Sequence, residues 1–257
     1  MSSQRKKWSP LKIFKTAWAV LGLTFLLWLA YSMQAHGVDP ALLRDSERVK
    51  FEETDDYYVF TPTTAHRERL IFFPGALVDP EAYVPLCSEL ASHNLEVHII
   101  KMPWRQAALG YEQPIEWELF GDTSLSYYLA GHSQGGKMAA RFVHEHPALI
   151  DKLILIGTTH PRDLSLAPMS IPILKVYGTH DGIAEEATIN ENRPQLPASA
   201  IFKRIDGANH SQFGYYGFQL GDNTAAISRA EQHAATVSAI LDFLRGASRS
   251  EAPPPPE

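Results

Sequence analysis

The sequence predicts an α/β domain built on a mostly parallel sheet with helices on both of its faces. From about residue 51 onward, short apolar segments alternate with amphipathic segments of helical period. Short apolar strands separated by helices are typical of a parallel sheet that is covered on both sides. The composition, 45% hydrophobic and 20% charged, is ordinary for a globular protein and excludes a disordered or fibrous one. We therefore expect one such domain over residues 51–247.

The strands and helices of this domain can be placed in order. Apolar strands are expected at residues 69–73, 95–100, 127–130, 152–156, 173–177 and 200–205, and helices at 80–93, 134–145 and 228–244. Asp79 is the expected N-cap of the first helix, with Pro80 in its first turn. Ligands of parallel sheets bind beyond the carboxyl ends of the strands. The loops that follow residues 73, 130, 177 and 205 should therefore form the functional edge.

Residues 16–35 predict a transmembrane signal anchor in front of the domain, because none of them is charged and the apolar run reaches the length of a bilayer span when its flanks are counted. The preceding basic segment, residues 1–15, predicts a cytoplasmic N-terminus and an extracytoplasmic domain. A cleaved signal peptide is the main alternative, with weak cleavage residues at Ala30 to Ser32. The length of the apolar run and its tryptophans, Trp18 and Trp28, favour the uncleaved anchor. A buried soluble helix is disfavoured because the segment is apolar all round.

Other features of the sequence mainly exclude classes of protein. The net charge of -6 argues against a nucleic-acid partner. The single cysteine, Cys87, excludes an intramolecular disulfide, and no histidine lies in a metal-ligand spacing with it. The proline run within residues 248–257 predicts an extended, solvated tail.

The strongest chemical motif is Gly131-His-Ser133-Gln-Gly135, which has the pattern of a nucleophile elbow between a strand and a helix. A serine on such a sharp turn is exposed at the sheet edge. Small neighbours at Gly131 and Gly135 allow the strand and the helix to approach closely. The start of the helix offers free N–H groups and a positive dipole end, which favour developing negative charge. The motif predicts Ser133 as a nucleophile.

A serine hydroxyl needs a base, and two later loops offer an acid and a base in the order typical of this arrangement. Asp181 follows the strand expected at 173–177, and His210 follows the one at 200–205. The alternatives are that Asp181 is a turn residue and that His210 is an ordinary polar loop residue. Their neighbours His180 and Asp206 are lower-ranked candidates. The combination of three residue types at three strand ends predicts the triad Ser133, Asp181 and His210.

An acyl-transfer site also needs N–H donors for an oxyanion. One should be the backbone of Gln134, next to the nucleophile. The second should come from the loop after residue 73, where Gly75 allows close approach and either Ala76 or Leu77 would donate. We favour Ala76.

At this point the sequence resembles a known group, the α/β-hydrolase fold-5 family, over roughly residues 69–244. The motifs that carry the resemblance are FFPGALVDPEAY (72–83), KMP (101–103), GHSQGG (131–136), GTHDG (178–182) and GANHSQFG (207–214). The resemblance implies the α/β-hydrolase fold, hydrolytic chemistry, the triad Ser133, Asp181 and His210, and an oxyanion loop at Gly75 and Ala76. Gln134 stands where a hydrophobic residue is common in related elbows, so its side chain is expected to add polarity to the pocket.

The pocket is expected to be open. Residues 157–172, where lipase-like relatives often insert a lid, are too few for a helical cap. The candidate substrate-binding residues are Leu77, Trp104, His160 and Phe213, which could equally be ordinary core residues.

The predicted function is that of a membrane-anchored serine hydrolase that cleaves a small-molecule carboxylic ester through an acyl-serine intermediate, without a metal or organic cofactor. An amidase, a thioesterase, an acyltransferase or a non-catalytic binding module are the alternatives. Neither the substrate nor the oligomeric state follows from the sequence.

Overall fold

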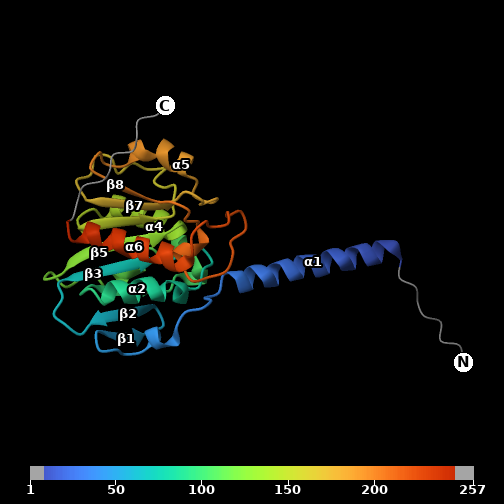
Figure 1. The fold of residues 1–257 in the computed structure, drawn as a ribbon, viewed down its shortest axis with the longest axis horizontal. Helices are drawn as coiled ribbons and strands as arrows, with labels where there is room; N and C mark the ends of the chain where they lie inside the picture. The colour runs from blue at the N-terminus through green and yellow to red at the C-terminus, as the bar shows by residue number, and fades with distance from the viewer. Residues whose placement is uncertain (1–8, 247–257) are drawn as a thin grey trace, which may run out of the picture.

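A computed structural model describes residues 9–246, and its body is an α/β domain around a single eight-stranded sheet (Figure 1). The strand order is β1-β2-β4-β3-β5-β6-β7-β8, and the six strands from β4 to β8 in this order are parallel. The bounds are β1 Val49–Glu53, β2 Tyr57–Pro62, β3 Glu68–Phe73, β4 Glu96–Ile100, β5 Ser126–His132, β6 Lys152–Ile156, β7 Ile173–Gly178 and β8 Ile201–Ile205. The predicted fold class is confirmed, and each predicted strand lies within two residues of its observed bounds.

The strands β1 and β2 form an antiparallel hairpin, which lies at one end of the strand order. The sequence analysis did not predict this hairpin. In β2 the side chains alternate between buried and half-buried positions, with Tyr58 and Phe60 facing the core. A strand with one half-exposed face has alternating apolar and polar residues, so β2 does not form the continuous apolar segment by which the parallel strands were predicted.

The helices lie on both faces of the sheet. Those that follow the first are α2 Val84–Ala91, α3 Gln113–Glu116, α4 Gln134–Glu145, α5 Glu186–Glu191 and α6 Arg229–Leu244. Short 3₁₀ turns are η1 Pro40–Leu43, η2 Pro80–Tyr83, η3 Pro103–Arg105, η4 Ala107–Leu109, η5 Arg193–Gln195 and η6 Ser211–Phe213. The helix predicted at 80–93 is thus two elements, η2 and α2. Asp79 caps η2, accepting from the Glu81 N–H at 3.1 Å. The helix α4 has the predicted bounds.

The core consists of two apolar layers separated by the sheet. Successive side chains of β3 point to opposite faces, so Leu70 and Phe72 pack under α2 and α6, whereas Ile71 and Phe73 pack under α4. This arrangement buries most residues of the parallel strands on both faces, except in the edge strand β8, where Lys203 and Arg204 are exposed. The carboxyl ends of the parallel strands therefore meet in one row of loops at a single edge of the sheet.

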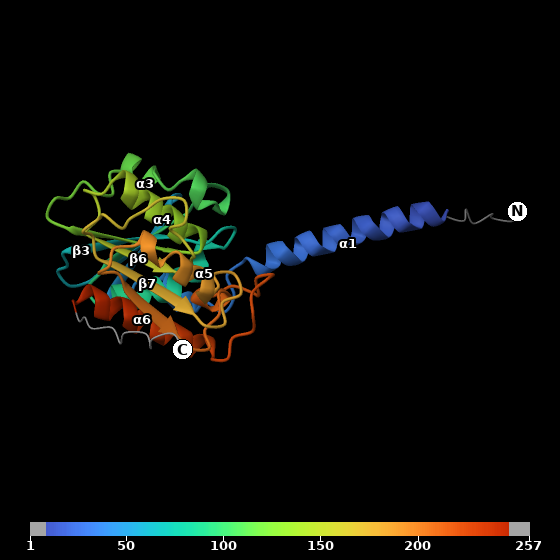
Figure 2. The same ribbon diagram turned by 90° about the horizontal axis from the view of Figure 1, so that it is seen from above.

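The helix α1, Pro10–Ser32, projects away from this body (Figures 1 and 2). Its 23 residues are long and apolar enough to cross a membrane, judged by length and composition, and its most apolar stretch is not buried against the body. It begins six residues before the predicted anchor of 16–35 and ends three residues before its limit. The residues before Ser9 and the proline tail at 248–257 lie outside the described residues.

The segment between β6 and β7, residues 157–172, contains no helix. It is an irregular loop, so the fold has no cap domain at this position, as predicted.

A lysine side chain is buried inside the body. Lys175, on β7, is buried, and its Nζ donates a hydrogen bond to the His160 carbonyl. Burial lowers the pKa of Lys175 from 10.5 to about 7. Between these two values the folded protein holds a neutral lysine, whereas the unfolded chain holds a charged one.

The unfolded state therefore binds more protons than the folded state between pH 7 and pH 10, and stability should rise with pH in that window. We predict that the free energy of unfolding of the wild type rises relative to that of Lys175→Met by up to about 1.4 kcal/mol per pH unit. Below pH 7 the difference should be constant, because the lysine is then charged in both states. Urea denaturation of both proteins in detergent measures this, and parallel stability curves would contradict it.

Candidate active site

Ser133 lies on the tight turn between β5 and α4. Its backbone has φ 54° and ψ -119°, a region that a residue with a side chain adopts only under constraint. The Ser133 N–H donates to the Ile156 carbonyl of β6 at 3.0 Å, which fixes the turn against the sheet.

The glycines around Ser133 are required by close approach. A Cβ at Gly131 would lie 2.4 Å from the carbonyl carbon of Gly135. A Cβ at Gly135 would lie 2.0 Å from the Phe73 carbonyl oxygen. The helix α4 thus crosses directly over β5 and the end of β3, which is the physical reason for the glycine pattern that the sequence analysis used.

Asp181 and His210 form a buried pair at the ends of β7 and β8. His210 Nδ1 lies 2.9 Å from Asp181 Oδ2 and 3.1 Å from Oδ1. Asp181 Oδ1 also accepts from the N–H groups of Ile183, at 2.9 Å, and Ala184, at 2.6 Å. The loop after β7 therefore holds the carboxylate with backbone donors while it binds the imidazole.

The two lower-ranked candidates lie elsewhere. His180 Nδ1 is 3.1 Å from the Thr224 carbonyl, and the exposed Asp206 pairs with Arg204 at 3.1 Å. The structure thus brings together His210 and Asp181 and places the alternatives in other contacts.

The second nitrogen of His210, Nε2, is buried and has no hydrogen-bond partner among residues 9–246. The structure contains no hydrogen bond between this nitrogen and the Ser133 hydroxyl. Hydrogen bonds of catalytic groups are often long before a substrate binds. Because Nδ1 faces Asp181, Nε2 is the nitrogen left to act as a base.

A chain of hydrogen bonds connects the elbow to the loop after β3. The Gly75 N–H donates to the Tyr83 hydroxyl at 3.0 Å, and that hydroxyl lies 2.8 Å from His132 Nδ1. Since the Tyr83 oxygen accepts from Gly75, its proton is directed to His132. Burial lowers the pKa of His132 well below its ordinary value, with His210 contributing, so His132 is neutral and its Nδ1 can accept a hydrogen bond from the Tyr83 hydroxyl. The rings of His132 and His210 are 4.5 Å apart.

Two backbone N–H groups near Ser133 are available for an oxyanion. A Cβ at Gly75 would lie 3.6 Å from Ser133 Cβ, so the loop after β3 runs beside the nucleophile. The Leu77 N–H already donates to the Arg105 carbonyl at 2.7 Å. The N–H groups of Ala76 and Gln134 have no acceptor within the part of the chain that the structure describes. These are the two donors that the sequence analysis preferred.

The Gln134 side chain does not contribute polarity to the pocket in the way that the sequence suggested. Its Oε1 accepts from the Ala107 N–H at 2.9 Å, and its Nε2 donates to Gln106 Oε1 at 2.9 Å. Both ends of the amide are therefore occupied by the loop after β4. The side chain fastens that loop to the elbow.

The four candidate substrate-binding residues lie in different environments. Leu77 and Trp104 are exposed, and both have positive φ values, 63° and 53°. Phe213 is buried, with its ring 5.7 Å from that of His132, so it supports the site from within the core. His160 lies in the loop after β6, 3.4 Å from Asp163, and burial is the main cause that lowers its pKa to about 4.

Asp222 is a buried residue of this region that the sequence analysis did not identify. Its carboxylate accepts from the N–H of His210 at 3.1 Å, of Gly182 at 3.2 Å and of Ser211 at 2.8 Å. It also accepts from the Ser211 hydroxyl at 2.6 Å. Asp222 therefore connects the loop that carries Asp181 to the loop that carries His210. A Gly-Asp-Asn turn gives no sequence signal for such a role.

A group of potential metal ligands is found away from the catalytic residues. The side chains of Glu112, Glu145 and His146 lie within 4.8 Å of one another at their ligand atoms. Both carboxylates are largely exposed, and Glu145 already binds Arg141 and Tyr111. These contacts account for the group without an ion.

Comparison with known proteins assigns the family. The model of the alpha/beta hydrolase family matches residues 69–234. The chain therefore belongs to the alpha/beta hydrolase family. No curated protein sequence matches it significantly.

Solved structures of low sequence identity share the fold. The protein TT1662 from Thermus thermophilus has a TM-score of 0.58 and 15% identity, with 79% of this chain and 100% of that chain covered. A ferulic acid esterase from Streptomyces cinnamoneus has a TM-score of 0.56 and 17% sequence identity, with 74% of this chain and 70% of that chain covered. A dienelactone hydrolase from Anabaena variabilis has a TM-score of 0.56 and 14% sequence identity, with 77% of this chain and 99% of that chain covered.

The hydrogen-bond chain through Tyr83 leads to a testable expectation. Tyr83→Phe removes the hydroxyl and leaves two buried groups, the Gly75 N–H and His132 Nδ1, without a partner. We predict a loss of about 1–3 kcal/mol of stability and a fall in kcat of about tenfold or more, since the oxyanion loop and the elbow lose their connection. Ester hydrolysis and chemical denaturation measure the two effects.

Tyr127→Phe is the matched control. The Tyr127 hydroxyl also accepts from a backbone N–H, that of Asp122 at 2.8 Å, but at the opposite edge of the sheet. Its loss should cost stability and leave kcat unchanged. Equal kcat values for the two variants would argue against a role of Tyr83 in the site.

Proposed function

We propose that the chain is a membrane-anchored serine hydrolase that cleaves carboxylic esters. The observation that carries the proposal is the buried pair of His210 Nδ1 and Asp181 Oδ2, 2.9 Å apart, beside an elbow that holds Ser133 at φ 54°. The ring of His132, next to Ser133 in the chain, lies against the ring of His210. In this proposal the nucleophile, the acid and the base come from the loops after β5, β7 and β8, at the carboxyl ends of the strands.

In the acylation half of the reaction, the Ser133 hydroxyl attacks the ester carbonyl carbon and His210 Nε2 accepts its proton. Asp181 keeps the other imidazole proton on Nδ1 and stabilises the charged ring. The carbonyl oxygen becomes an oxyanion, which the N–H groups of Ala76 and Gln134 bind. Breakdown of this intermediate expels the alcohol, which takes the proton from Nε2, and leaves an acyl-serine.

In the deacylation half, a water molecule attacks the acyl carbon and His210 Nε2 takes one of its protons. The second tetrahedral intermediate uses the same two backbone donors. It collapses to release the carboxylic acid, and the proton returns to Ser133. No metal or organic cofactor is required for these steps, since the oxyanion donors and the imidazole supply the catalysis.

An ester is the favoured substrate because the similar solved structures include a ferulic acid esterase and a dienelactone hydrolase. The same triad would also suit an amidase, a thioesterase or an acyltransferase, and these remain alternatives. A non-catalytic binding module is disfavoured, because it would have no need for a buried Asp181–His210 pair or for free N–H groups beside Ser133.

Ser133→Ala provides the direct test. A fluorophosphonate probe should label the wild type and not the variant. Hydrolysis of short p-nitrophenyl esters should fall by at least about 10³-fold, because removal of a triad member leaves only the oxyanion donors and binding. Ser124→Ala, in an exposed loop at the opposite edge, is the control and should keep full labelling. A folded wild type that the probe does not label would overturn the enzyme assignment.

We further propose that α1 is an uncleaved anchor with its N-terminus in the cytoplasm, as the basic residues before the apolar stretch favour. Lys12 and Lys15 lie in the first two turns of the helix. On intact cells or spheroplasts that produce the protein, added protease should digest the catalytic domain. Protection until the membrane is permeabilised would reverse the proposed orientation.

A further inference from the structure

The helix α1 joins the body without a linker. Its last residue, Ser32, donates from its hydroxyl to the Phe218 carbonyl at 2.5 Å, and its own carbonyl accepts from the Gly217 N–H at 2.7 Å. The next residue, Met33, is already buried in the core, and its carbonyl accepts from the Asp79 N–H at 2.8 Å. The body therefore begins where the helix ends.

The segments that hold this junction belong to the catalytic edge. Asp79 ends the loop that carries Ala76, and Arg105 binds it with an Nη2–Oδ2 distance of 2.7 Å. The same Arg105 nitrogen binds Gln34 at 3.1 Å, and the Arg105 carbonyl accepts from Leu77. Phe218 follows His210 in the loop between β8 and α6. Figures 1 and 2 accordingly show α1 leaving the body on the side where the parallel strands end.

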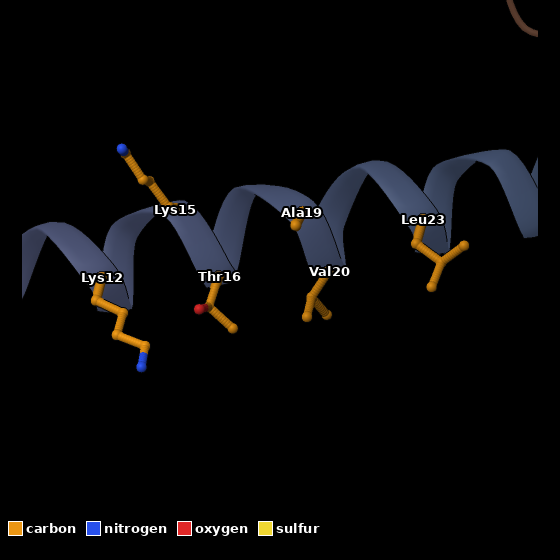
Figure 3. Close-up of a pocket in the computed structure, with 6 residues that line it drawn as sticks. All are labelled: Lys12, Lys15, Thr16, Ala19, Val20 and Leu23. Carbon is orange, nitrogen blue, oxygen red and sulfur yellow. The ribbon is translucent and has the colours of Figure 1, made fainter. Parts of the chain in front are cut away.

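The length of α1 leaves no room between a membrane and this edge. Its 23 residues extend over about 34 Å, close to the roughly 30 Å of a bilayer's hydrocarbon core. Figure 3 shows the charged ends of Lys12 and Lys15 leaving the helix just before the apolar side chains of Ala19, Val20 and Leu23. The shallow hollow there is formed by one helix alone, so we assign it no ligand. If the apolar stretch spans the bilayer, Ser32 lies at its far surface, with the catalytic edge beside it.

That edge carries exposed apolar side chains, which we call the apolar rim. Its members and their exposed fractions are Leu77 (44%), Trp104 (86%), Phe218 (48%) and Leu220 (62%). Among the described residues outside α1, the remaining exposed large apolar side chains are Leu109 and Ile115. The backbone of Leu77 and Trp104 has positive φ. Aromatic and apolar side chains that face water next to a spanning helix suit the interface of a bilayer.

We propose that the apolar rim rests in the surface of the phospholipid bilayer that α1 spans, so that the active site receives its ester from the membrane. The substrate class is then an amphiphilic ester with a long acyl or alcohol chain. The long acyl or alcohol chain of the substrate would remain in the lipid while its ester group reaches Ser133, which no cap domain covers. This inference rests on the proposed function, both the anchor and the esterase activity.

A spectroscopic experiment tests the position of the rim without using activity. The full-length protein carrying Cys87→Ala is labelled with a fluorophore at Phe218→Cys, or at Thr123→Cys as control, and reconstituted into phosphatidylcholine vesicles. Thr123 is exposed in the loop before β5, at the opposite edge of the sheet. A lipid with a nitroxide near its headgroup should quench the label at position 218 and not the one at position 123. Equal quenching at both positions, or none at 218, would overturn the docking.

A kinetic experiment tests the substrate class. In the same vesicles, Phe218→Ser combined with Leu220→Ser should slow hydrolysis of membrane-embedded 4-methylumbelliferyl oleate about tenfold, because the rim loses its apolar contact with lipid. Hydrolysis of soluble p-nitrophenyl acetate should stay within about twofold, since neither residue lies in the triad or among the oxyanion donors. Ile115→Ser, an exposed apolar residue in α3, is the control and should keep both rates. An equal loss for both esters, or for neither, would reject the proposal.

The two experiments separate this inference from the proposed function. Quenching of the label at position 218, together with a wild-type protein that cleaves no ester and takes no fluorophosphonate, would reject the esterase and support the docking. Full esterase activity with no quenching at 218 would reject the docking and support the esterase.

Discussion

The structure depends on one steric constraint, the contact of bare backbone where α4 starts over β5 and β3. Gly135 lies so close to the Phe73 carbonyl that any side chain would collide with it, and Gly131 meets Gly135 in the same way. This contact forces the turn that holds Ser133 at positive φ and points the first N–H groups of α4 at the edge of the sheet. It also brings the loop of Gly75 beside the nucleophile. The conformation of Ser133 and the position of the proposed oxyanion donors thus follow from the same contact.

The rest of the site is held by buried polar groups. Asp181 binds backbone N–H groups and His210, and Asp222 joins the two loops from behind. Tyr83 joins the elbow to the oxyanion loop. Each of these groups is satisfied by several partners, and unpaired buried polar groups are costly, so the loops have few alternative arrangements.

The parts of this protein that could be predicted from sequence are those with a local pattern. The parallel strands are short apolar segments, α4 has an amphipathic pattern, and Ser133, Asp181 and His210 each follow a strand, so the topology alone places them at one edge. The β1–β2 hairpin was missed because its strands are half exposed. The roles of Tyr83, Asp222 and the Gln134 side chain were missed because each depends on partners distant in sequence. Phe213 lies in the core rather than on a pocket wall, because a loop pattern does not reveal which way an aromatic side chain points.

The burial of Met33 changes where the domain boundary of this protein lies. A hydrophobic pattern places the boundary near residue 35, and a truncation at that point would remove Ser32 and Met33 together with the apolar helix. Met33 fills part of the core, and full burial of such a side chain is worth about 1.5–3 kcal/mol. Ser32 forms hydrogen bonds with the Gly217 N–H and the Phe218 carbonyl. The globular unit therefore includes Ser32, the last residue of α1, and Met33, and a form that lacks the apolar part of α1 must retain both residues.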